Sequence, residues 1–291
     1  MSAPAVSVVI RCRNEARDLG GVLDAVLAQQ GAPPFEVLAL DSGSTDGTLE
    51  LLGRYPIRTA TLGDAFSYGR ALNTGAQFAR GPLVVYLSAH ARPRGRDWLA
   101  ALVAPFADPH TAATFGRQIA VPGVNPIEAI TTARVFPPAP PAGVTFSTAN
   151  GAVRRDAVLA RPFDEEIAIA EDHVWATGVV PPGRIAYVPA AVVTHSHPMT
   201  LAAWGGRFRA HGLAAEYARR RLGMALPWGE PDDRVARVAR GRAGAFLRLA
   251  ATLARDGELG AIARLPAYAI ARTVCYARGL REGAARFGSR A

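Results

Sequence analysis

The chain has 291 residues, of which 49% are hydrophobic and 20% charged, and this balance excludes a wholly disordered protein. No apolar run reaches the roughly eighteen residues that a membrane-spanning helix needs, and the two cysteines lack the spacing of a zinc or redox site. The net charge is +9 with a pI near 10.4, and all 33 basic residues are arginine. Arginine suits phosphate, so nucleotide diphosphates, anionic lipid and nucleic acid are candidate partners, although a compositional bias of the genome explains the excess equally well.

The first apolar run, residues 6–10, is short and β-branched, which is typical of a buried strand. It lacks the length and the basic leader of a secretion signal, so we expect a cytoplasmic protein. Polar residues follow at once and precede an amphipathic helix. Such residues at the end of a parallel strand line the crevice where open α/β sheets bind ligands, so we expect a nucleotide beside Arg11, Arg13, Asn14 and Glu15.

A second apolar run, residues 35–40, leads directly into Asp41 and a turn rich in glycine and serine. This acidic strand end predicts another part of the same nucleotide site, with Asp41 accepting hydrogen bonds from a base or ribose and Ser44 in the adjacent turn. Turn formation and helix capping are the simpler alternatives for the aspartates here. We expect the alternative to hold for Asp46 and the nucleotide contact to hold for Asp41.

Strands and helices continue to alternate through about the first 120 residues. The pattern predicts a third strand at 57–62, a helix at 66–79 and a fully buried strand at 83–87. This alternation predicts an α/β fold in which a mostly parallel central sheet carries helices on both faces.

Prolines cluster between residues 121 and 144, which predicts a long surface loop that serves as a lid or a binding loop. From residue 201 the pattern is helical to the end. We therefore expect a nucleotide-binding catalytic domain at 1–200 and a helical carboxy-terminal extension at 201–291. The extension is expected to contact an acceptor, an anionic membrane surface or a second copy of the chain, and its basic face includes Arg234, Arg237, Arg240 and Arg248.

Six segments, in order over roughly the first 210 residues, carry a family resemblance: VSVVIRCRNEA, LDSGSTDGT, FSYGRALNTGAQFARGPLVVYLSAHARP, FGRQI, AEDHVWA and VTHSHPMTLAAWGGRFRAHG. Together they resemble the inverting family 2 glycosyltransferases of the type A fold, and within these the rhamnosyltransferase-like enzymes of bacterial surface polysaccharide synthesis. One such match would be weak, whereas six in order are strong. The resemblance implies transfer of a sugar from a nucleotide-diphosphate donor to a hydroxyl of a glycan or lipid-linked glycan, with inversion at the anomeric carbon.

The resemblance places Asp41 at the donor nucleotide. It also includes residues 66–73, where Arg70 and Asn73 stand near the start of a helix whose backbone amides favour an anion. Arg70 is therefore a candidate contact for the donor diphosphate, with a surface ion pair as an equally weighted alternative. Asn73 is expected to bind the donor too.

Family 2 enzymes usually carry an aspartate-any-aspartate motif after the fourth strand, where carboxylates hold a divalent cation, but here the position reads Ser88-Ala89-His90. Ser88 can bond a ribose hydroxyl, and a neutral histidine can ligate manganese or a softer transition metal, whereas magnesium prefers oxygen. By resemblance His195, with His197 beside it, completes the site. We expect Mn²⁺ or Mg²⁺ there; in the metal-free alternative, arginine and histidine offset the charge of the leaving group.

Two adjacent acids, Glu171 and Asp172, begin a predicted helix. Inversion requires a base that takes the proton of the acceptor hydroxyl as its oxygen attacks. By resemblance Asp172 is that base and Glu171 orients it or the acceptor, and crowding of the two carboxylates is expected to raise one pKa. Without the resemblance, favourable interaction with the helix dipole explains the pair better.

Two other functions stay open. The altered motif at residues 88–90 allows a catalytically inactive module that only binds nucleotide-sugars. A nucleotidyltransferase would share the nucleotide site, but it favours a glycine- and basic-rich loop after the first strand, and this loop is poor in glycine. Nucleic-acid binding is the weakest alternative, because the arginines are not interleaved with aromatic residues in a stacking pattern.

Overall fold

The computed structural model describes residues 3–63, 66–139, 146–179, 184–197, 200–226 and 247–288. The chain divides into two compact units. The first consists of Met1–Val121, Ala133–Glu166 and Glu171–Ser196. The second consists of Pro122–Thr132, Ile167–Ala170 and His197–Ala291.

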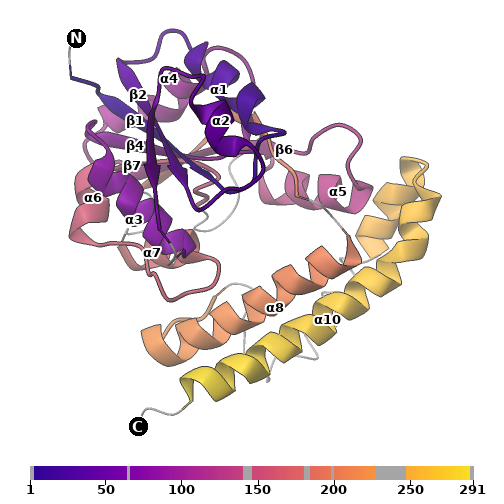
Figure 1. The fold of residues 1–291 in the computed structure, drawn as a ribbon. Helices are drawn as coiled ribbons and strands as arrows, with labels where there is room; N and C mark the ends of the chain where they lie inside the picture. Colours follow the sequence, from indigo (N-terminus) through magenta and orange to yellow (C-terminus); the bar gives the residue numbers. More distant parts are fainter. Residues whose placement is uncertain are drawn as a thin grey trace. The chain divides into compact units, whose positions relative to one another are not determined.

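The first unit is built on a central sheet (Figure 1). Within the described residues the sheet has eight strands in the order β3-β2-β1-β4-β7-β6-β8-β5. Their bounds are β1 Val6–Cys12, β2 Phe35–Asp41, β3 Arg58–Thr61, β4 Leu83–Ser88, β5 Arg92–Pro93, β6 Ala113–Ile119, β7 Asn150–Arg154 and β8 Ile185–Thr194.

Six of these eight described strands point the same way. β1 pairs in parallel with β2 and β4, β2 with β3, and β6 with β8. β7 lies antiparallel between β4 and β6, so the common direction resumes beyond it, and the two-residue β5 runs antiparallel to β8. The predicted mostly parallel sheet is therefore confirmed, and the carboxyl ends of β1, β2, β4 and β8 open at one edge.

Helices cover both faces of this sheet, as predicted (Figure 1). Successive side chains of a strand point to opposite faces, so Val8 and Ile10 of β1 pack in one apolar cluster and Val9 in the other. The first cluster includes residues of α1 and α4, and the second includes residues of α3, α6 and α7. The helices are α1 Leu19–Leu27, α2 Thr48–Leu52, α3 Tyr68–Phe78, α4 Trp98–Val103, α6 Arg155–Ala160 and α7 Glu171–Val179, with a 3-10 turn at Ala104–Ala107.

The expected loop at 121–144 was partly wrong, because it contains a helix, α5, at Pro126–Val135. Proline is tolerated in the first turn of a helix, where its missing N–H would have no partner within the helix. Asn125 accepts a hydrogen bond from the Ile127 amide at 2.9 Å and so satisfies one of the exposed donors of that turn. A proline-rich sequence therefore does not exclude a helix that begins at a proline.

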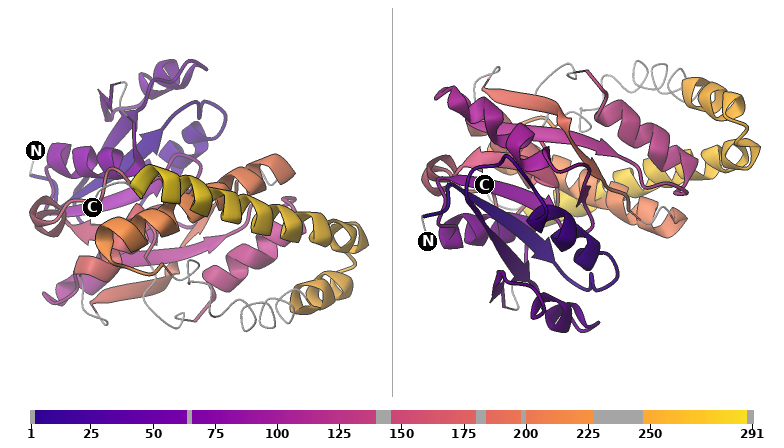
Figure 2. Two further views of the ribbon diagram at one scale, coloured as in Figure 1. Left: turned by 90° about the horizontal axis from the view of Figure 1, so that it is seen from below. Right: turned by 90° about the horizontal axis from the view of Figure 1, so that it is seen from above.

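The second unit contains two long helices, α8 Leu201–Tyr217 and α10 Leu259–Phe287, which lie side by side (Figures 1 and 2). Residues 218–222 continue α8 as a π-helical turn, and residues 247–255 are helical too. Glycines allow close backbone contact: a Cβ at Gly212 would collide with the Tyr276 carbonyl, and one at Gly279 with the Arg209 carbonyl. The predicted helical extension is thus confirmed for the described part of the chain.

No helix among the described residues combines the length and the apolar character that a membrane crossing requires. Of the four arginines predicted to form a basic amphipathic face, only Arg248 is described, on an exposed position of the 247–255 helix. Arg234, Arg237 and Arg240 lie outside the described residues.

Candidate active site

The predicted nucleotide-binding residues lie at the carboxyl ends of three adjacent parallel strands. In the sheet register, Cys12 of β1 lies opposite Asp41 of β2, and Arg11 lies opposite Ser88 of β4. The loops that follow these strands therefore leave the sheet side by side. The sequence prediction that these loops share one edge is confirmed by this register.

The loops after β1 and β2 are joined by hydrogen bonds. The Asn14 amide donates to Ser44 Oγ at 2.9 Å, and the Thr45 amide donates to Asn14 Oδ1 at 2.8 Å. Asn14 has a left-handed backbone, with φ of 56°, which asparagine adopts more readily than most residues. The Glu15 amide donates to Thr48 Oγ1 at 2.9 Å. Asn14 and Ser44 therefore hold the loop after β1 against the loop after β2.

Asp41 is buried, with 1% of its surface exposed, and organises the turn that follows it. Its Oδ1 accepts from the amides of Gly43 and Ser44 at 2.9 and 3.0 Å, and its Oδ2 accepts from the Ser44 hydroxyl. Cys12 Sγ also lies 3.9 Å from Oδ2, so three donors of the turn and one of β1 hold this carboxylate in place. Asp46 accepts from the Thr48 amide at 3.1 Å and from the Ala16 amide at 3.1 Å, which is a turn role of the kind predicted for it.

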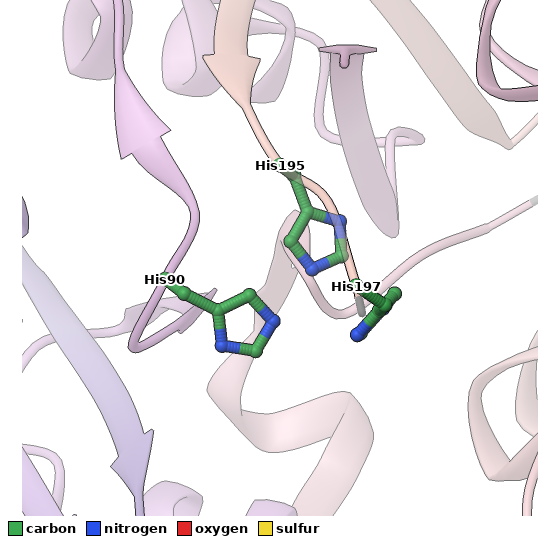
Figure 3. A group of neighbouring side chains, drawn as sticks. All are labelled: His90, His195 and His197. Carbon is green, nitrogen blue, oxygen red and sulfur yellow. The ribbon is translucent and has the colours of Figure 1, made fainter. Parts of the chain in front are cut away.

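A histidine cluster lies at the same edge (Figure 3). The His90 and His195 rings stack, with centroids 4.9 Å apart and an interplanar angle of 19°. One ligand nitrogen from each of His90, His195 and His197 lies within 4.8 Å of the others. The three predicted metal ligands, which come from two distant parts of the sequence, are therefore neighbours.

The short strand β5 explains why the histidines meet. His90 follows β4, whereas His195 follows β8, and two other strands separate β4 from β8 in the sheet. Directly after His90 the chain forms β5, in which Arg92 pairs with Thr194 of β8. Because Thr194 precedes His195, this pairing brings the end of β4 to the end of β8.

Each stacked histidine has a hydrogen-bonded partner at Nδ1. His90 Nδ1 lies 2.9 Å from Glu15 Oε1, and His195 Nδ1 lies 2.7 Å from Gln118 Oε1. Contacts of this kind fix the ring orientation and make Nε2 the ligand atom for a metal. Two nitrogens each about 2.1 Å from one ion are at most about 4.2 Å apart, so small side-chain movements would bring the cluster into coordination geometry.

The acidic pair occupies the first turn of α7. Asp172 Oδ2 accepts from the Thr148 amide at 3.1 Å, and Oδ1 accepts from the His173 amide at 2.8 Å. Arg11 connects this pair to β1: its Nη1 lies 3.8 Å from Glu171 Oε1, and its Nη2 donates to Thr148 Oγ1 at 3.4 Å. β1 and its loop therefore reach the acids through Arg11 and the histidines through Glu15.

Burial raises the pKa values of both acids. It raises the pKa of Glu171 from 4.5 to about 7, with a further increase from Asp172 and an opposing effect of Arg11. It also raises the pKa of Asp172, and the amides of Thr148 and His173 oppose that increase. The predicted crowding effect is thus present but smaller than the effect of burial. A carboxylate with a raised pKa is a stronger base, which suits removal of a proton from a hydroxyl.

The remaining predicted donor residues differ in their surroundings. Arg13 and Arg70 are exposed, and Ser88 is half-buried at the end of β4. Asn73 is buried, and its amide binds the segment after α6: Nδ2 donates to the Phe163 carbonyl and to Glu165 Oε1, both at 2.9 Å. These bonds give Asn73 a structural role in holding that segment.

The sequence prediction did not identify three residues that hold the site. Gln118 orients His195, Thr148 binds Asp172 and Arg11, and Glu128 of α5 accepts from the His197 amide at 2.6 Å. Gln118 stood within the family-like FGRQI segment, which was a usable signal. Thr148 and Glu128 lie in no such segment, and their contacts depend on the tertiary structure.

The chain is similar in sequence to known glycosyltransferases. The family model described as Glycosyl transferase family 2 matches residues 7–148. The O-antigen chain rhamnosyltransferase RfbN of Salmonella typhimurium is 28% identical over 213 residues, which cover 67% of this chain and 67% of that protein. A Pre-mycofactocin glycosyltransferase of Mycobacterium tuberculosis is 29% identical over 226 residues, which cover 72% of this chain but only 46% of the relative.

Solved structures show the same fold. The mannosyltransferase PcManGT from Pyrobaculum calidifontis, in complex with GDP-Man and Mn²⁺, has a TM-score of 0.62 at 23% identity, covering 100% of this chain and 89% of that one. The glucosyl-3-phosphoglycerate synthase from Mycobacterium tuberculosis, in complex with Mn²⁺, UDP-glucose and phosphoglyceric acid, has a TM-score of 0.57 at 20% identity, covering 79% and 81%. At these identities the likeness establishes the fold.

Proposed function

Because the Glycosyl transferase family 2 model matches residues 7–148 and a solved mannosyltransferase shares the fold, we propose that this chain is an inverting glycosyltransferase of the type A fold. It moves a sugar from a nucleotide-diphosphate donor to a hydroxyl of a glycan or lipid-linked glycan. The observation that carries this proposal is that β1 and its loop contact an acidic pair through Arg11 and a histidine cluster through Glu15. Glycosyl transfer needs a base for the acceptor hydroxyl and a group that offsets the charge of the donor diphosphate, and these two must lie close together.

Asp172 is the proposed base. Its carboxylate takes the proton from the acceptor hydroxyl while the hydroxyl oxygen forms a bond to the anomeric carbon. The bond from that carbon to the diphosphate breaks on the opposite side, and the electron pair leaves with the diphosphate, so the configuration inverts. The Thr148 and His173 amides hold the carboxylate in one orientation, and burial strengthens it as a base.

Glu171 is the proposed partner of this base. Its pKa near 7 allows it to hold a proton at neutral pH, which limits charge repulsion beside Asp172. The Arg11 side chain lies beside this pair and is only 12% exposed, and its Cζ lies 5.6 Å from the ring centroid of the exposed Tyr68. We assign Arg11 to the negative charge of the donor, together with the loop residues Asn14 and Ser44.

A divalent cation is the proposed cofactor, held by His90, His195 and His197. Nitrogen ligands suit Mn²⁺ and softer transition metals better than Mg²⁺, which prefers oxygen. When bound, such a cation would neutralise charge on the departing diphosphate. The Mn²⁺ in the complexes of two structural neighbours supports this choice.

Rhamnose is the proposed sugar and a bacterial surface polysaccharide the proposed product, on the basis of the similarity to RfbN. The protein is proposed to act in the cytoplasm, at the inner face of the membrane where a lipid-linked acceptor is accessible. The exposed face of α10 supports a location at the membrane.

α10 has an exposed apolar face opposite the one that packs on α8. Leu259, Ile270 and Val274 are spaced by nearly whole helical turns, and their exposed fractions are 70%, 64% and 60%. Arg278 and Arg281 are exposed farther along the same face. Apolar side chains beside arginine fit an anionic lipid surface. We assign the face to lipid, with contact to a second copy of the chain as the alternative.

An assay of the leaving group tests the proposed reaction. Purified protein with Mn²⁺ is incubated with UDP-glucose, GDP-mannose and a nucleotide-rhamnose, and released nucleoside diphosphate is measured. A glycosyltransferase releases nucleoside diphosphate. Donor binding without release would support the inactive module. Pyrophosphate release in a parallel incubation with a nucleoside triphosphate and a sugar 1-phosphate would support the nucleotidyltransferase.

A further inference from the structure

Glu15 is held in place by hydrogen bonds at both its backbone amide and its side chain. Its backbone amide donates to Thr48 Oγ1 at 2.9 Å, and Thr48 Oγ1 in turn donates to Asp46 Oδ1 at 2.5 Å. Its side chain reaches His90, where Oε1 lies 2.9 Å from Nδ1. The side chains of Glu15 and His90 are 22% and 26% exposed. Because this carboxylate is already anchored and partly buried, it loses little further conformational entropy when it holds the His90 ring in place.

His195 offers an internal comparison. Its Nδ1 also has a side-chain oxygen partner, at 2.7 Å, but that oxygen belongs to the neutral amide of Gln118. The two stacked rings are thus held in the same manner, one by a charged group and one by an uncharged group. In the histidine cluster all the ligands are themselves uncharged when they bind a metal. The Glu15 carboxylate is thus a negative group joined directly to the stacked pair.

We propose that Glu15 is a positioning residue for the cation site: it orients His90 so that Nε2 faces the ion, and it supplies negative charge through the imidazole ring. This inference rests on the proposed cation cofactor. It differs from the sequence prediction, in which Glu15 bound the donor nucleotide. A carboxylate that accepts from Nδ1–H increases the electron density at Nε2 and strengthens its bond to a metal.

The charge and the hydrogen bond make separable contributions. Glu15→Gln keeps an oxygen that accepts from Nδ1 but removes the charge, and Glu15→Ala removes both. Glu50→Gln is the matched control, because Glu50 lies in the first turn of nearby α2 and is exposed. The same carboxylate-to-amide change there leaves His90 untouched.

Metal binding is measured directly on the full chain, without donor or acceptor. Co²⁺ is titrated into wild type and variants, and the visible absorption of bound Co²⁺ gives both the affinity and the ligand geometry. Free Mn²⁺, followed by its electron paramagnetic resonance signal, gives a second affinity. We expect Glu15→Gln to weaken binding about 10-fold and Glu15→Ala up to about 100-fold with an altered Co²⁺ spectrum, while Glu50→Gln matches wild type.

The outcomes separate this inference from the proposed cofactor. If His90→Ala loses metal binding while Glu15→Gln and Glu15→Ala bind like wild type, the role of Glu15 is refuted and the cation site stands. If wild type binds neither ion, both proposals fail. Thermal unfolding of each variant identifies any loss of binding that comes from a loss of fold.

Discussion

Arg11 Nη1 lies 3.8 Å from Glu171 Oε1, and this contact joins the carboxyl end of β1 to the first turn of α7. The two residues are distant in the sequence and come from different structural elements. Arg11 opposes the effect of burial on the Glu171 pKa, so the protonation of the acidic pair depends on β1.

Replacement of the base should abolish transfer while leaving donor binding intact. We expect Asp172→Asn to lower the transfer rate by about 100-fold to 10,000-fold, because the amide cannot take the acceptor proton. The dissociation constant of the donor, measured by calorimetry, should stay within about threefold. Asp156→Asn is the control, since Asp156 is an exposed acid in the first turn of α6. Transfer at the wild-type rate by Asp172→Asn would refute the assignment.

The raised pKa of Glu171 should make stability depend on pH. The folded protein holds this proton up to about pH 7, whereas the unfolded chain releases it near 4.5. Its contribution is therefore complete below pH 4.5 and is lost as the pH rises toward 7 and above. We expect Glu171→Gln to raise Tm relative to wild type at pH 8 and to leave it nearly unchanged at pH 4.5. An equal difference at both pH values, by calorimetry, would contradict this expectation.

Removal of divalent ions should lower activity, and nitrogen ligation should decide which ion restores it. After treatment with EDTA, we expect Mn²⁺ or Co²⁺ to restore transfer at least about tenfold better than Mg²⁺. His195→Ala should lose this response, and His110→Ala should keep it, because His110 is exposed and outside the cluster. Equal restoration by Mg²⁺ would argue against a histidine site.

The exposed face of α10 should bind anionic membranes. We expect the protein to sediment with vesicles that contain phosphatidylglycerol and to remain in the supernatant with phosphatidylcholine alone. Ile270→Glu should weaken sedimentation, and added salt should weaken it as well. Leu49→Glu serves as the control, since Leu49 is 47% exposed on α2. If Ile270→Glu sediments like wild type, the lipid-binding surface lies elsewhere.

Glycines in α10 should respond to substitution in opposite directions. Gly279→Ala would place a Cβ against the Arg209 carbonyl on α8, so we expect a loss of about 1–3 kcal/mol of stability. Gly260→Ala, where an added Cβ would meet no atom within 4 Å apart from its chain neighbours and the backbone of its own helix, should gain up to about 1 kcal/mol, because alanine is the better helix former. Thermal unfolding of both variants checks the packing of α8 on α10. Wild-type stability of Gly279→Ala would show that α10 does not pack on α8 in this way.

The sequence predicted most of the first unit because its strands have continuous apolar runs and end in polar residues. The strand expected at 83–87 is found at Leu83–Ser88, and the helix expected at 66–79 is found at Tyr68–Phe78. The three histidines were proposed together from family-like segments, and they are neighbours. In each case a local pattern or a motif carried the information.

The other features depend on contacts that no local pattern encodes. β5 has two residues, too few for any periodicity, yet it joins β4 to β8. Glu15 looked like one more polar residue at a strand end, and its contact with His90 needs both loops in place. Asn73 resembled a donor contact, but its buried amide binds Phe163 and Glu165 instead of facing outward.

The pairing of Arg92 with Thr194 also orders events during synthesis of the chain. A ribosome releases β4 and β5 long before β8, so a growing chain that contains His90 has no His195 to stack against it. Capture of the proposed cation through both rings must wait until residue 195 has emerged and docked. Metal retention by a nascent chain would therefore mark the moment at which the last long strand joins the sheet.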